Sequence, residues 1–345
     1  MTSAGRWTLW AAVFATVAAI AWRHRASVVE AVDLMGGARP LWLGLALAAV
    51  ALVYLCRARV YGIPLQLLDY TVPWSFLWQA AVIASAANQL VPTGGVSSYA
   101  FLTWALHKRG VSMGQAPLIA LIDTLSYAFA AATLVVAALV YLALSGLLDF
   151  PWLLTGFGPG FALLTLGIWV YWLQRRRERL VPRALALQRR LGRWLGREWS
   201  DAPLRSFLDE YYKGKDVLGR RPRAFLKMVA LQYLAVAADA SALYLTFAAL
   251  GLTVRPALVL LGFVVTLAAG SFVNAPAGGG SFEVVMSAFF AHHGLETSQA
   301  VAGALLFRVV SFWIPVLVGG ALVWRFRERR IEIRRRFPRR RRSGT

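Results

Sequence analysis

The sequence predicts an all-α polytopic membrane protein, and three observations support this class. Hydrophobic residues make up 59% of the 345 residues and charged residues only 15%, with a mean hydropathy of +0.58. Apolar runs recur along the chain, and most approach the ~20 residues that a helix needs to cross a bilayer. A large soluble core would require polar faces on these helices, and such faces are nearly absent. The runs are Trp7–Trp22, Leu41–Cys56, Leu118–Leu144, Trp152–Leu173, Met228–Leu250, Ala257–Ala275 and Val301–Trp324.

The basic residues predict how these runs are oriented. The formal net charge is +21, and of 37 Lys and Arg residues 15 lie in the segment 174–223 and 11 in the segment 325–345. Both segments flank apolar runs, so the positive-inside rule places them in the cytoplasm. Anionic lipid headgroups are their expected partners, and nucleic-acid binding is the weaker alternative. We therefore expect a multi-pass protein of a prokaryotic cytoplasmic (inner) membrane, with both termini in the cytoplasm.

Alternation between the two sides of the membrane then orders the elements. The run Leu41–Cys56 should end in the cytoplasm beside Arg57 and Arg59, Leu118–Leu144 should lead outward, and Trp152–Leu173 should return to the basic loop. We expect a single transmembrane domain over residues 1–345. Its parts are repeat 1 at about 40–144 with a hairpin at 74–107, a cytoplasmic basic loop at 174–223, repeat 2 at about 224–324 with a hairpin at 256–293, and a cytoplasmic basic tail at 325–345.

Two similar breaks interrupt the apolar sequence, one in each half. They read Pro92-Thr93-Gly94-Gly95 and Pro276-Ala277-Gly278-Gly279-Gly280, and in both the first proline precedes a later glycine by 18 positions. By charge parity, the segment 74–107 starts and ends in the cytoplasm, whereas the segment 256–293 starts and ends outside. A short arm such as that after the second break cannot span the bilayer. The sequence therefore predicts an inverted repeat with two oppositely oriented re-entrant hairpins of broken helices.

The breaks are candidates for a binding site because proline and glycine release backbone groups from helical pairing. Such groups are tolerated at membrane depth only against protein or a water-filled cavity. The arms that restart at Ser97 and Ser281 would present helix N-termini, whose N–H groups and partial positive charge suit a phosphate. Asn88 and Asn274 precede the breaks and are expected to cap freed backbone or to contact a headgroup. Simple bends in the helix bundle are the alternative interpretation.

Four ionisable residues lie well inside apolar runs: Asp123, Asp239, Glu283 and Arg308. Each costs at least ~2.5 kcal/mol at the bilayer centre, so each should face a partner or water. Arg308 is suited to bind a lipid phosphate bidentately, with either Glu283 or Asp123 as its partner in the protein. A purely structural pair of Arg308 with Asp123 remains open, and so does a local role for Glu283 at its helix dipole.

The residues around both breaks also match a known pattern. In the second half this comprises Asn274 to Glu283, then Leu306-Phe307-Arg308 and Phe312-Trp313-Ile314-Pro315, and in the first half it comprises Asn88 to Gly95 and Asp123. These motifs resemble the lysylphosphatidylglycerol synthase transmembrane family, also called the flippase-like domain, over roughly residues 10–330. The chain departs from the family after the first break, where serines stand in place of the acidic residue and Arg that many members carry.

The resemblance implies a lipid flippase that moves a polar, phosphate-bearing lipid. Some members are fused to a cytoplasmic aminoacyl-transferase, and we expect a stand-alone member without it. A membrane-embedded lipid-modifying enzyme is one alternative, and an accessory subunit that docks a cytoplasmic synthase is another. No catalytic constellation, metal site or cofactor is expected, and the lipid and oligomeric state stay open. The expected substrate-binding residues are Glu283, Arg308, Asp123, Asn88, Asn274, Ser97, Ser281, Gly94, Gly95, Gly278, Gly279 and Gly280, with Pro92 and Pro276 at the breaks.

Overall fold

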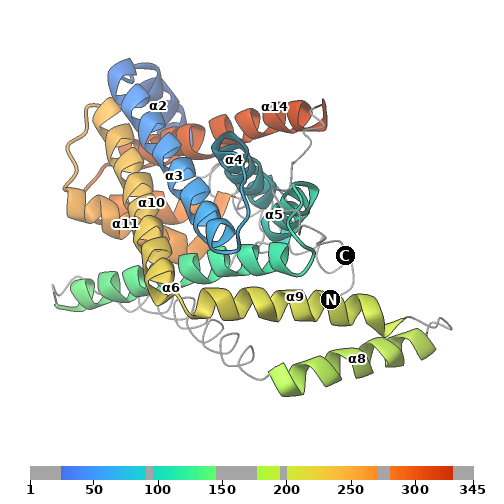
Figure 1. Ribbon diagram of the computed structural model, residues 1–345. Coiled ribbons are helices and arrows are strands. Elements are labelled where there is room, and N and C mark those ends of the chain that lie inside the picture. The colour runs from blue at the N-terminus through green and yellow to red at the C-terminus, as the bar shows by residue number, and fades with distance from the viewer. Residues whose placement is uncertain (1–24, 91–95, 145–176, 195–199, 271–279, 329–345) are drawn as a thin grey trace, which may run out of the picture.

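The computed structural model describes residues 25–90, 96–144, 177–194, 200–270 and 280–328 (Figure 1). All regular secondary structure in these ranges is helical, which confirms the prediction of an all-α polytopic membrane protein. The elements are α2 (Arg25–Gly36), α3 (Pro40–Leu67), α4 (Trp74–Leu90), α5 (Val96–Lys108), α6 (Gln115–Leu144), α8 (Arg177–Trp194), α9 (Asp201–Gly219), α10 (Pro222–Ala249), α11 (Pro256–Gly270), α12 (Ser281–His292), α13 (Thr297–Arg308), the π-helix η2 (Val309–Trp313) and α14 (Ile314–Glu328).

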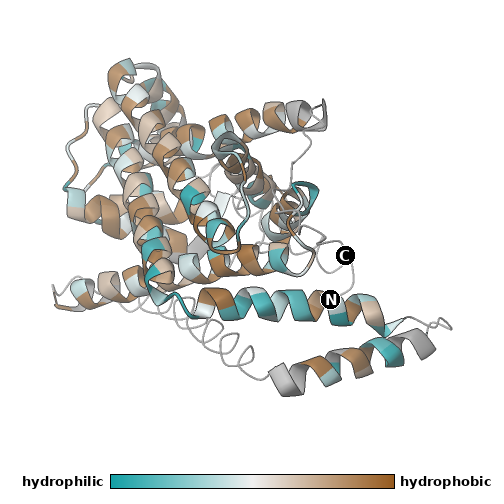
Figure 2. Ribbon diagram, in the orientation of Figure 1, coloured by the Kyte–Doolittle hydropathy of each residue, from teal (hydrophilic) through white to brown (hydrophobic). Residues whose placement is uncertain are grey.

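Within the described ranges, four helical segments are long and apolar enough to cross a membrane: Pro40–Leu67, Gln115–Ala138, Pro222–Ala249 and Thr297–Val323. They contain most of the apolar runs at 41–56, 118–144, 228–250 and 301–324, because composition and length alone decide whether a helix can span. Hydrophobic residues, brown in Figure 2, dominate these helices, whereas α8 and α9 also carry many hydrophilic residues, drawn in teal. The runs Trp7–Trp22 and Trp152–Leu173 lie outside the described residues.

The centre of the bundle is the pair α3 and α10, which run side by side over much of their length (Figure 1). At one end the N–H of Arg39 donates to the carbonyl of Ala249 at 2.9 Å. The helix α3 continues through Arg57 and Arg59 to Leu67, although the sequence analysis ended its apolar run at Cys56. The expectation that this run ends in the cytoplasm beside Arg57 and Arg59 stays a prediction. Arg57 lies in the middle of a helix, and polar groups of neighbouring helices lie close to it, as described below.

Shorter helices flank each predicted break and pack against each other in pairs, α4 with α5 and α11 with α12. In the second pair, Gly262 of α11 allows the rings of Phe289 and Phe290 of α12 to approach its backbone closely. The helix α4 also packs against α14, where Gly319 approaches Ala86. The breaks at 91–95 and 271–279 are outside the described residues, so the re-entrant hairpins and their inverted symmetry stay predictions.

The last apolar run forms a composite helix with a wide turn in its middle. The helix α13 ends at Arg308, the π-helical turn Val309–Trp313 follows, and α14 continues from Ile314. The turn packs against both α3 and α10. A π-turn inside an α-helix is rare and occurs frequently at functional sites. The turn therefore draws attention to Arg308, the residue that immediately precedes it.

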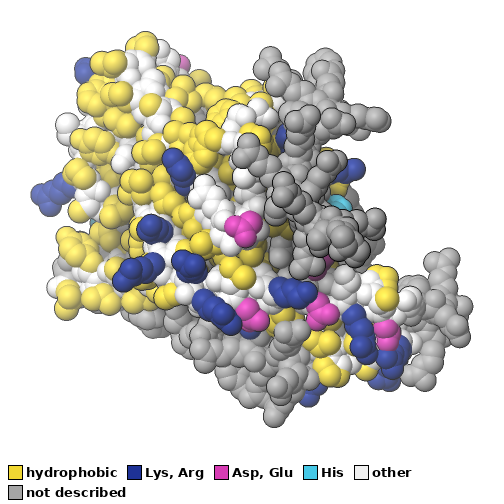
Figure 3. Space-filling view, viewed as in Figure 1, with side chains coloured by type: hydrophobic (Ala, Val, Ile, Leu, Met, Phe, Trp, Pro, Cys, Tyr) yellow, Lys and Arg dark blue, Asp and Glu magenta, His cyan; other side chains and the backbone are white. Residues whose placement is uncertain are grey.

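The basic segment folds into two helices, and α9 fastens to the start of α6. The Glu210 carboxylate accepts a hydrogen bond from the N–H of Gly114 at 3.2 Å, and a Cβ on Gly114 would overlap the α9 backbone. Nearby, the Tyr70 hydroxyl donates to Gln115 Oε1 at 2.7 Å. In Figure 3, basic and acidic side chains gather along the lower edge of the molecule while hydrophobic side chains cover the region above. This separation is typical of a bilayer-embedded bundle with a polar layer at one membrane surface.

The close approach of α13 to α10 gives a test of the packing. A methyl group at Gly303 would overlap the fully buried ring of Phe247, so Gly303→Ala should lower stability by about 1–3 kcal/mol. Gly44→Ala on α3 is the matched control, because a Cβ there meets nothing within 4 Å. Thermal unfolding of the purified protein in detergent would measure both, and equal melting temperatures for the two variants would contradict this packing.

Candidate functional site

The most distinctive site in the second half is a partly buried ion pair between Glu283 and Arg308. Glu283 lies in the first turn of α12, and Arg308 is the last residue of α13. The Arg308 Nε donates to Glu283 Oε1 at 2.6 Å, with side chains only 14% and 20% exposed. The sequence analysis left open whether Arg308 pairs with Glu283 or Asp123, and the structure pairs it with Glu283. Charge-assisted bonds of this length are among the strong ones in proteins.

Aromatic rings surround the Arg308 guanidinium. Its central carbon lies 5.0 Å from the ring centroid of Phe282 and 4.4 Å from that of Phe312. The ring of Phe282 in turn stacks on Phe307 at 6.1 Å. A guanidinium is weakly hydrated and binds aromatic faces well, which a lysine ammonium does less effectively. We call Glu283, Arg308, Phe282, Phe307 and Phe312 the Arg308 site.

One oxygen of this site has no hydrogen-bond partner among the described residues. Glu283 Oε2 is buried and accepts no hydrogen bond from the residues that the structure describes. A buried unsatisfied carboxylate oxygen is uncommon, since leaving one unpaired costs roughly 1–3 kcal/mol or more for a charged group. The arrangement therefore leaves an acceptor position inside the Arg308 site that a donor from outside the described protein can fill.

The second break ends in a glycine with a left-handed backbone conformation, directly before α12. Gly280 precedes α12 with φ of 81°, a left-handed conformation that disfavours any side chain. Ser281 begins the helix and is half-buried. The remaining predicted site residues of this break, namely Asn274, Pro276, Gly278 and Gly279, lie outside the described residues.

The first break shows a different use of its serine. The Ser97 hydroxyl donates to the carbonyl of Ala87 at 3.1 Å, which ties the start of α5 to the end of α4. Asn88 is exposed at the end of α4. Pro92, Gly94 and Gly95 are outside the part of the chain that the structure describes. Ser97 is thus placed to hold the two arms together across the break.

Asp123 belongs to another group of polar residues, centred on Arg57. The Gln232 side-chain amide donates to Asp123 Oδ1 at 3.0 Å and to Ser126 Oγ at 3.3 Å. Arg57 reaches Ser85 Oγ at 3.4 Å and lies 5.9 Å from the Tyr127 ring centroid. Asp123 and Asp239 both interact electrostatically with Arg57. The Arg57 cluster comprises Arg57, Ser85, Asp123, Tyr127, Gln232 and Asp239.

Sequence reasoning missed Arg57 because a charge at the end of an apolar run was taken as a membrane boundary. The helical pattern continues beyond it, and buried Val60, Tyr61 and Leu65 follow on α3. Tyr54 and Tyr61 stand three residues before and four residues after Arg57, so all three share one helix face. This periodicity was the available signal for placing Arg57 at depth.

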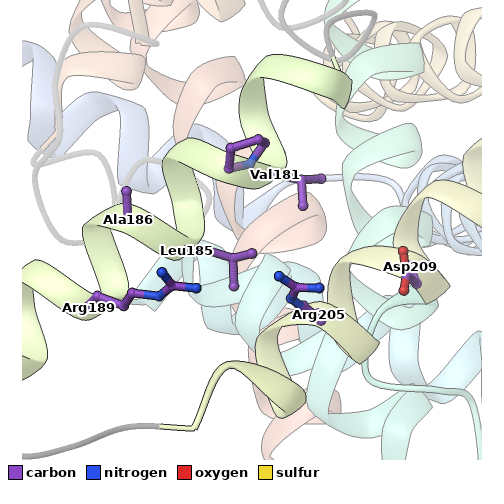
Figure 4. Close-up of a pocket in the computed structure, with 7 residues that line it drawn as sticks. Val181, Leu185, Ala186, Arg189, Arg205 and Asp209 are labelled. Carbon is purple, nitrogen blue, oxygen red and sulfur yellow. The ribbon is translucent and has the colours of Figure 1, made fainter.

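A cavity of about 340 Å³ lies apart from both sites, between α8 and α9 (Figure 4). Its lining residues are Val181, Pro182, Leu185, Ala186, Arg189, Arg205 and Asp209. An ion pair of Arg189 with Asp201 joins the two helices, and its hydrogen bond holds the pKa of the Asp201 carboxyl below its usual value. The cavity is therefore a feature of the basic segment and not of the charged sites in the bundle.

Within the described ranges, no three His, Cys, Asp or Glu side chains converge closely enough to hold a metal ion. The fold and its two sites define a polytopic helical membrane protein with buried guanidinium groups in its bundle. The chain belongs to the family of the lysylphosphatidylglycerol synthase TM region, which matches residues 8–319. This confirms the resemblance seen in the sequence.

Two relatives carry the same general description. A UPF0104 membrane protein of Pyrococcus horikoshii is 35% identical over 111 residues, which cover 32% of this chain and 33% of the relative. A UPF0104 membrane protein of Methanothermobacter thermautotrophicus is 20% identical over 303 residues, covering 85% of this chain and 88% of the relative. The chain thus matches only a third of the first relative but most of the second.

The conformation of Gly280 gives a prediction for the site. Gly280→Ala would place a Cβ at positive φ, which costs about 1–2 kcal/mol, and should displace Glu283 from Arg308. Gly320→Ala in α14 is the control, because a Cβ there meets no atom within 4 Å. The melting temperature should fall for Gly280→Ala alone. An unchanged value for Gly280→Ala would show that the turn before α12 is not left-handed.

The ion pair itself can be tested by a double-mutant cycle. Glu283→Gln and Arg308→Gln should each lower stability by about 1–3 kcal/mol, because each leaves a partly buried charge without its partner. The double variant removes both charges and should be more stable than either single variant. Thermal unfolding in detergent measures all four proteins, and strictly additive losses would mean that the two side chains do not interact.

Proposed function

We propose that the protein is a lipid flippase or transporter that translocates a phosphate-bearing lipid across the cytoplasmic membrane. Membership of the lysylphosphatidylglycerol synthase TM family supports a role in lipid handling. The observation that carries the proposal is the aromatic-enclosed Arg308, held by a carboxylate at the first turn of α12. Such a guanidinium inside an apolar bundle is the group best suited to receive a phosphate from a lipid.

Exchange of partners gives this site a mechanism. Glu283 holds Arg308 and compensates its charge. A lipid phosphate would compete with Glu283 for the guanidinium, because it can accept two parallel hydrogen bonds from arginine. The rings of Phe282 and Phe312 keep water away and hold the guanidinium plane. Glu283 would then act as a placeholder whose displacement accompanies lipid binding.

The hairpins and the inverted repeat complete the proposal. Two re-entrant hairpins from opposite faces would enclose a midplane cavity into which the headgroup enters, while the acyl chains stay in the bilayer. Pro92 and Pro276 would form the breaks, and Asn88, Asn274, Ser97, Ser281 and the neighbouring glycines would surround the cavity. Rocking of repeat 1 (about 40–144) against repeat 2 (about 224–324) would alternate access between the leaflets.

The basic helices have an accompanying role at the cytoplasmic surface. The helix α8 exposes Leu187 and Trp194 together with several arginines, a combination that suits adsorption to an anionic bilayer. With α9 fastened to α6, such adsorption would hold the bundle at a fixed height and tilt. The loop 174–223 and the tail 325–345 are accordingly proposed to lie in the cytoplasm against headgroups.

Translocation in proteoliposomes tests the proposal. A fluorescent phosphatidylglycerol in the outer leaflet becomes protected from a membrane-impermeant quencher when the wild-type protein moves it inward. Arg308→Lys keeps the charge but loses the bidentate geometry, so the rate should fall by roughly tenfold or more, because a hydrogen bond to a charged group contributes ~1.5–3 kcal/mol.

Arg255→Ala is the matched control, since Arg255 is an exposed arginine of the same half of the chain. It should translocate at the wild-type rate. Equal rates for wild type and Arg308→Lys would rule out bidentate phosphate binding at Arg308. A wild-type protein that moves no phosphate-bearing lipid, tested with anionic and zwitterionic headgroups, would refute the function.

A further inference from the structure

Charge is unbalanced in the Arg57 cluster. Two carboxylates, Asp123 on α6 and Asp239 on α10, interact with the single guanidinium of Arg57 on α3. With both carboxylates ionised, the cluster would carry one net negative charge inside an apolar bundle. An uncompensated charge at membrane depth costs at least ~2.5 kcal/mol even by insertion scales. The cluster therefore requires one further positive charge, such as a bound proton or cation, to be neutral.

The geometry identifies where this equivalent binds. In the described part of the chain neither carboxylate forms a direct ion pair with Arg57, whose guanidinium instead reaches Ser85 Oγ at 3.4 Å. Asp123 is fixed by the amide of Gln232 at 3.0 Å. Asp239 is half-buried, and no side chain or backbone group of the described residues hydrogen-bonds it. It lies seven residues after Gln232, on the same face of α10.

We propose that Asp239 binds and releases a proton, and that this proton is coupled to lipid translocation. A metal cation between the carboxylates would be repelled by the guanidinium of Arg57, whereas a proton neutralises Asp239 without adding a second cationic centre. With Asp239 protonated, Arg57 balances Asp123 alone. With Asp239 ionised, one guanidinium is shared by two carboxylates, so the forces between α3, α6 and α10 differ in the two states.

The surroundings of Asp239 contain few other groups that could take this role. Tyr54 and Tyr61 of α3 and Tyr127 of α6 face the cluster and interact electrostatically with Arg57. The sequences of α4, α11 and η2 contain no titratable residue, and α13 contains only Arg308. Among the carboxyl groups of these elements and of α3, α6 and α10, only Asp123 and Asp239 can carry an exchangeable proton. The helix α9, which also packs against α3, α6 and α10, carries four further carboxyl groups, at Asp201, Asp209, Glu210 and Asp216.

The π-helix η2 connects this cluster with the Arg308 site. It packs against both α3 and α10, and its Phe312 lies 4.4 Å from the Arg308 guanidinium carbon. A shift of α3 against α10 on protonation therefore reaches the ring that encloses Arg308. This coupling rests on the proposed lipid translocation, whereas proton binding by Asp239 does not.

Infrared difference spectroscopy tests proton binding independently of transport. Spectra of the full-length protein in lipid nanodiscs, recorded across a pH titration, should contain the carbonyl band of a buried protonated carboxylic acid that disappears as the pH rises. The band should be absent from Asp239→Asn and retained in Asp33→Asn, whose carboxylate is exposed on α2. A band that is missing from the wild type, or that persists in Asp239→Asn, would overturn the assignment.

A translocation assay with an imposed pH gradient tests the coupling. The wild-type rate should change with the gradient, the rate of Asp239→Asn should not, and Asp239→Glu should restore the dependence. A wild-type rate that ignores the pH gradient, or that responds to a sodium gradient at equal pH, would overturn coupling to protons. If the wild type moves no lipid at all, the proposed function and the coupling fail together, while the infrared band still decides whether Asp239 binds a proton.

Discussion

The cost of keeping a guanidinium away from water governs the arrangement of this bundle. A charged group inside hydrocarbon must be compensated by a partner, so helices that carry such groups have to face one another. Arg57 requires polar faces on α4, α6 and α10, and Arg308 requires the first turn of α12. The relative rotation of these helices follows from those two requirements, and the apolar packing of α3 against α10 fits around them.

The two arginines meet this requirement in different ways. Among the described residues, Arg308 pairs with the carboxylate of Glu283 and has aromatic rings on its sides, which suits the replacement of one anion by another. Arg57 has two carboxylates at some distance and several hydroxyl or amide groups nearby, which makes a more polar site whose net charge can change. A transporter needs both kinds of site if a driving reaction is to be separated from the cargo. The turn η2 is the common neighbour that keeps them in mechanical contact.

Part of this organisation was predictable from the sequence. Spanning helices such as Pro222–Ala249 depend on composition and length, which a sequence displays directly. The choice of Glu283 over Asp123 as the partner of Arg308 depends on how distant helices are rotated, and no local pattern contains that information. The polar cluster around Arg57 was not predicted, because a basic residue after an apolar run is typical of a membrane edge. The π-turn after Arg308 was invisible, since it leaves the hydrophobic pattern almost unchanged.

That π-turn has a consequence for how the protein can change in evolution. A wide turn contains one residue more than an α-helical turn, and one residue corresponds to about 100° of helix rotation. Loss of a single position between Val309 and Trp313 would convert the turn to regular helix and swing Arg308 away from the face that α14 presents to α4. The number of residues in this turn therefore fixes the angle between the face that carries Arg308 and the face of α14 that packs on α4. We expect the length of this segment to be constrained more strictly than the identity of its side chains.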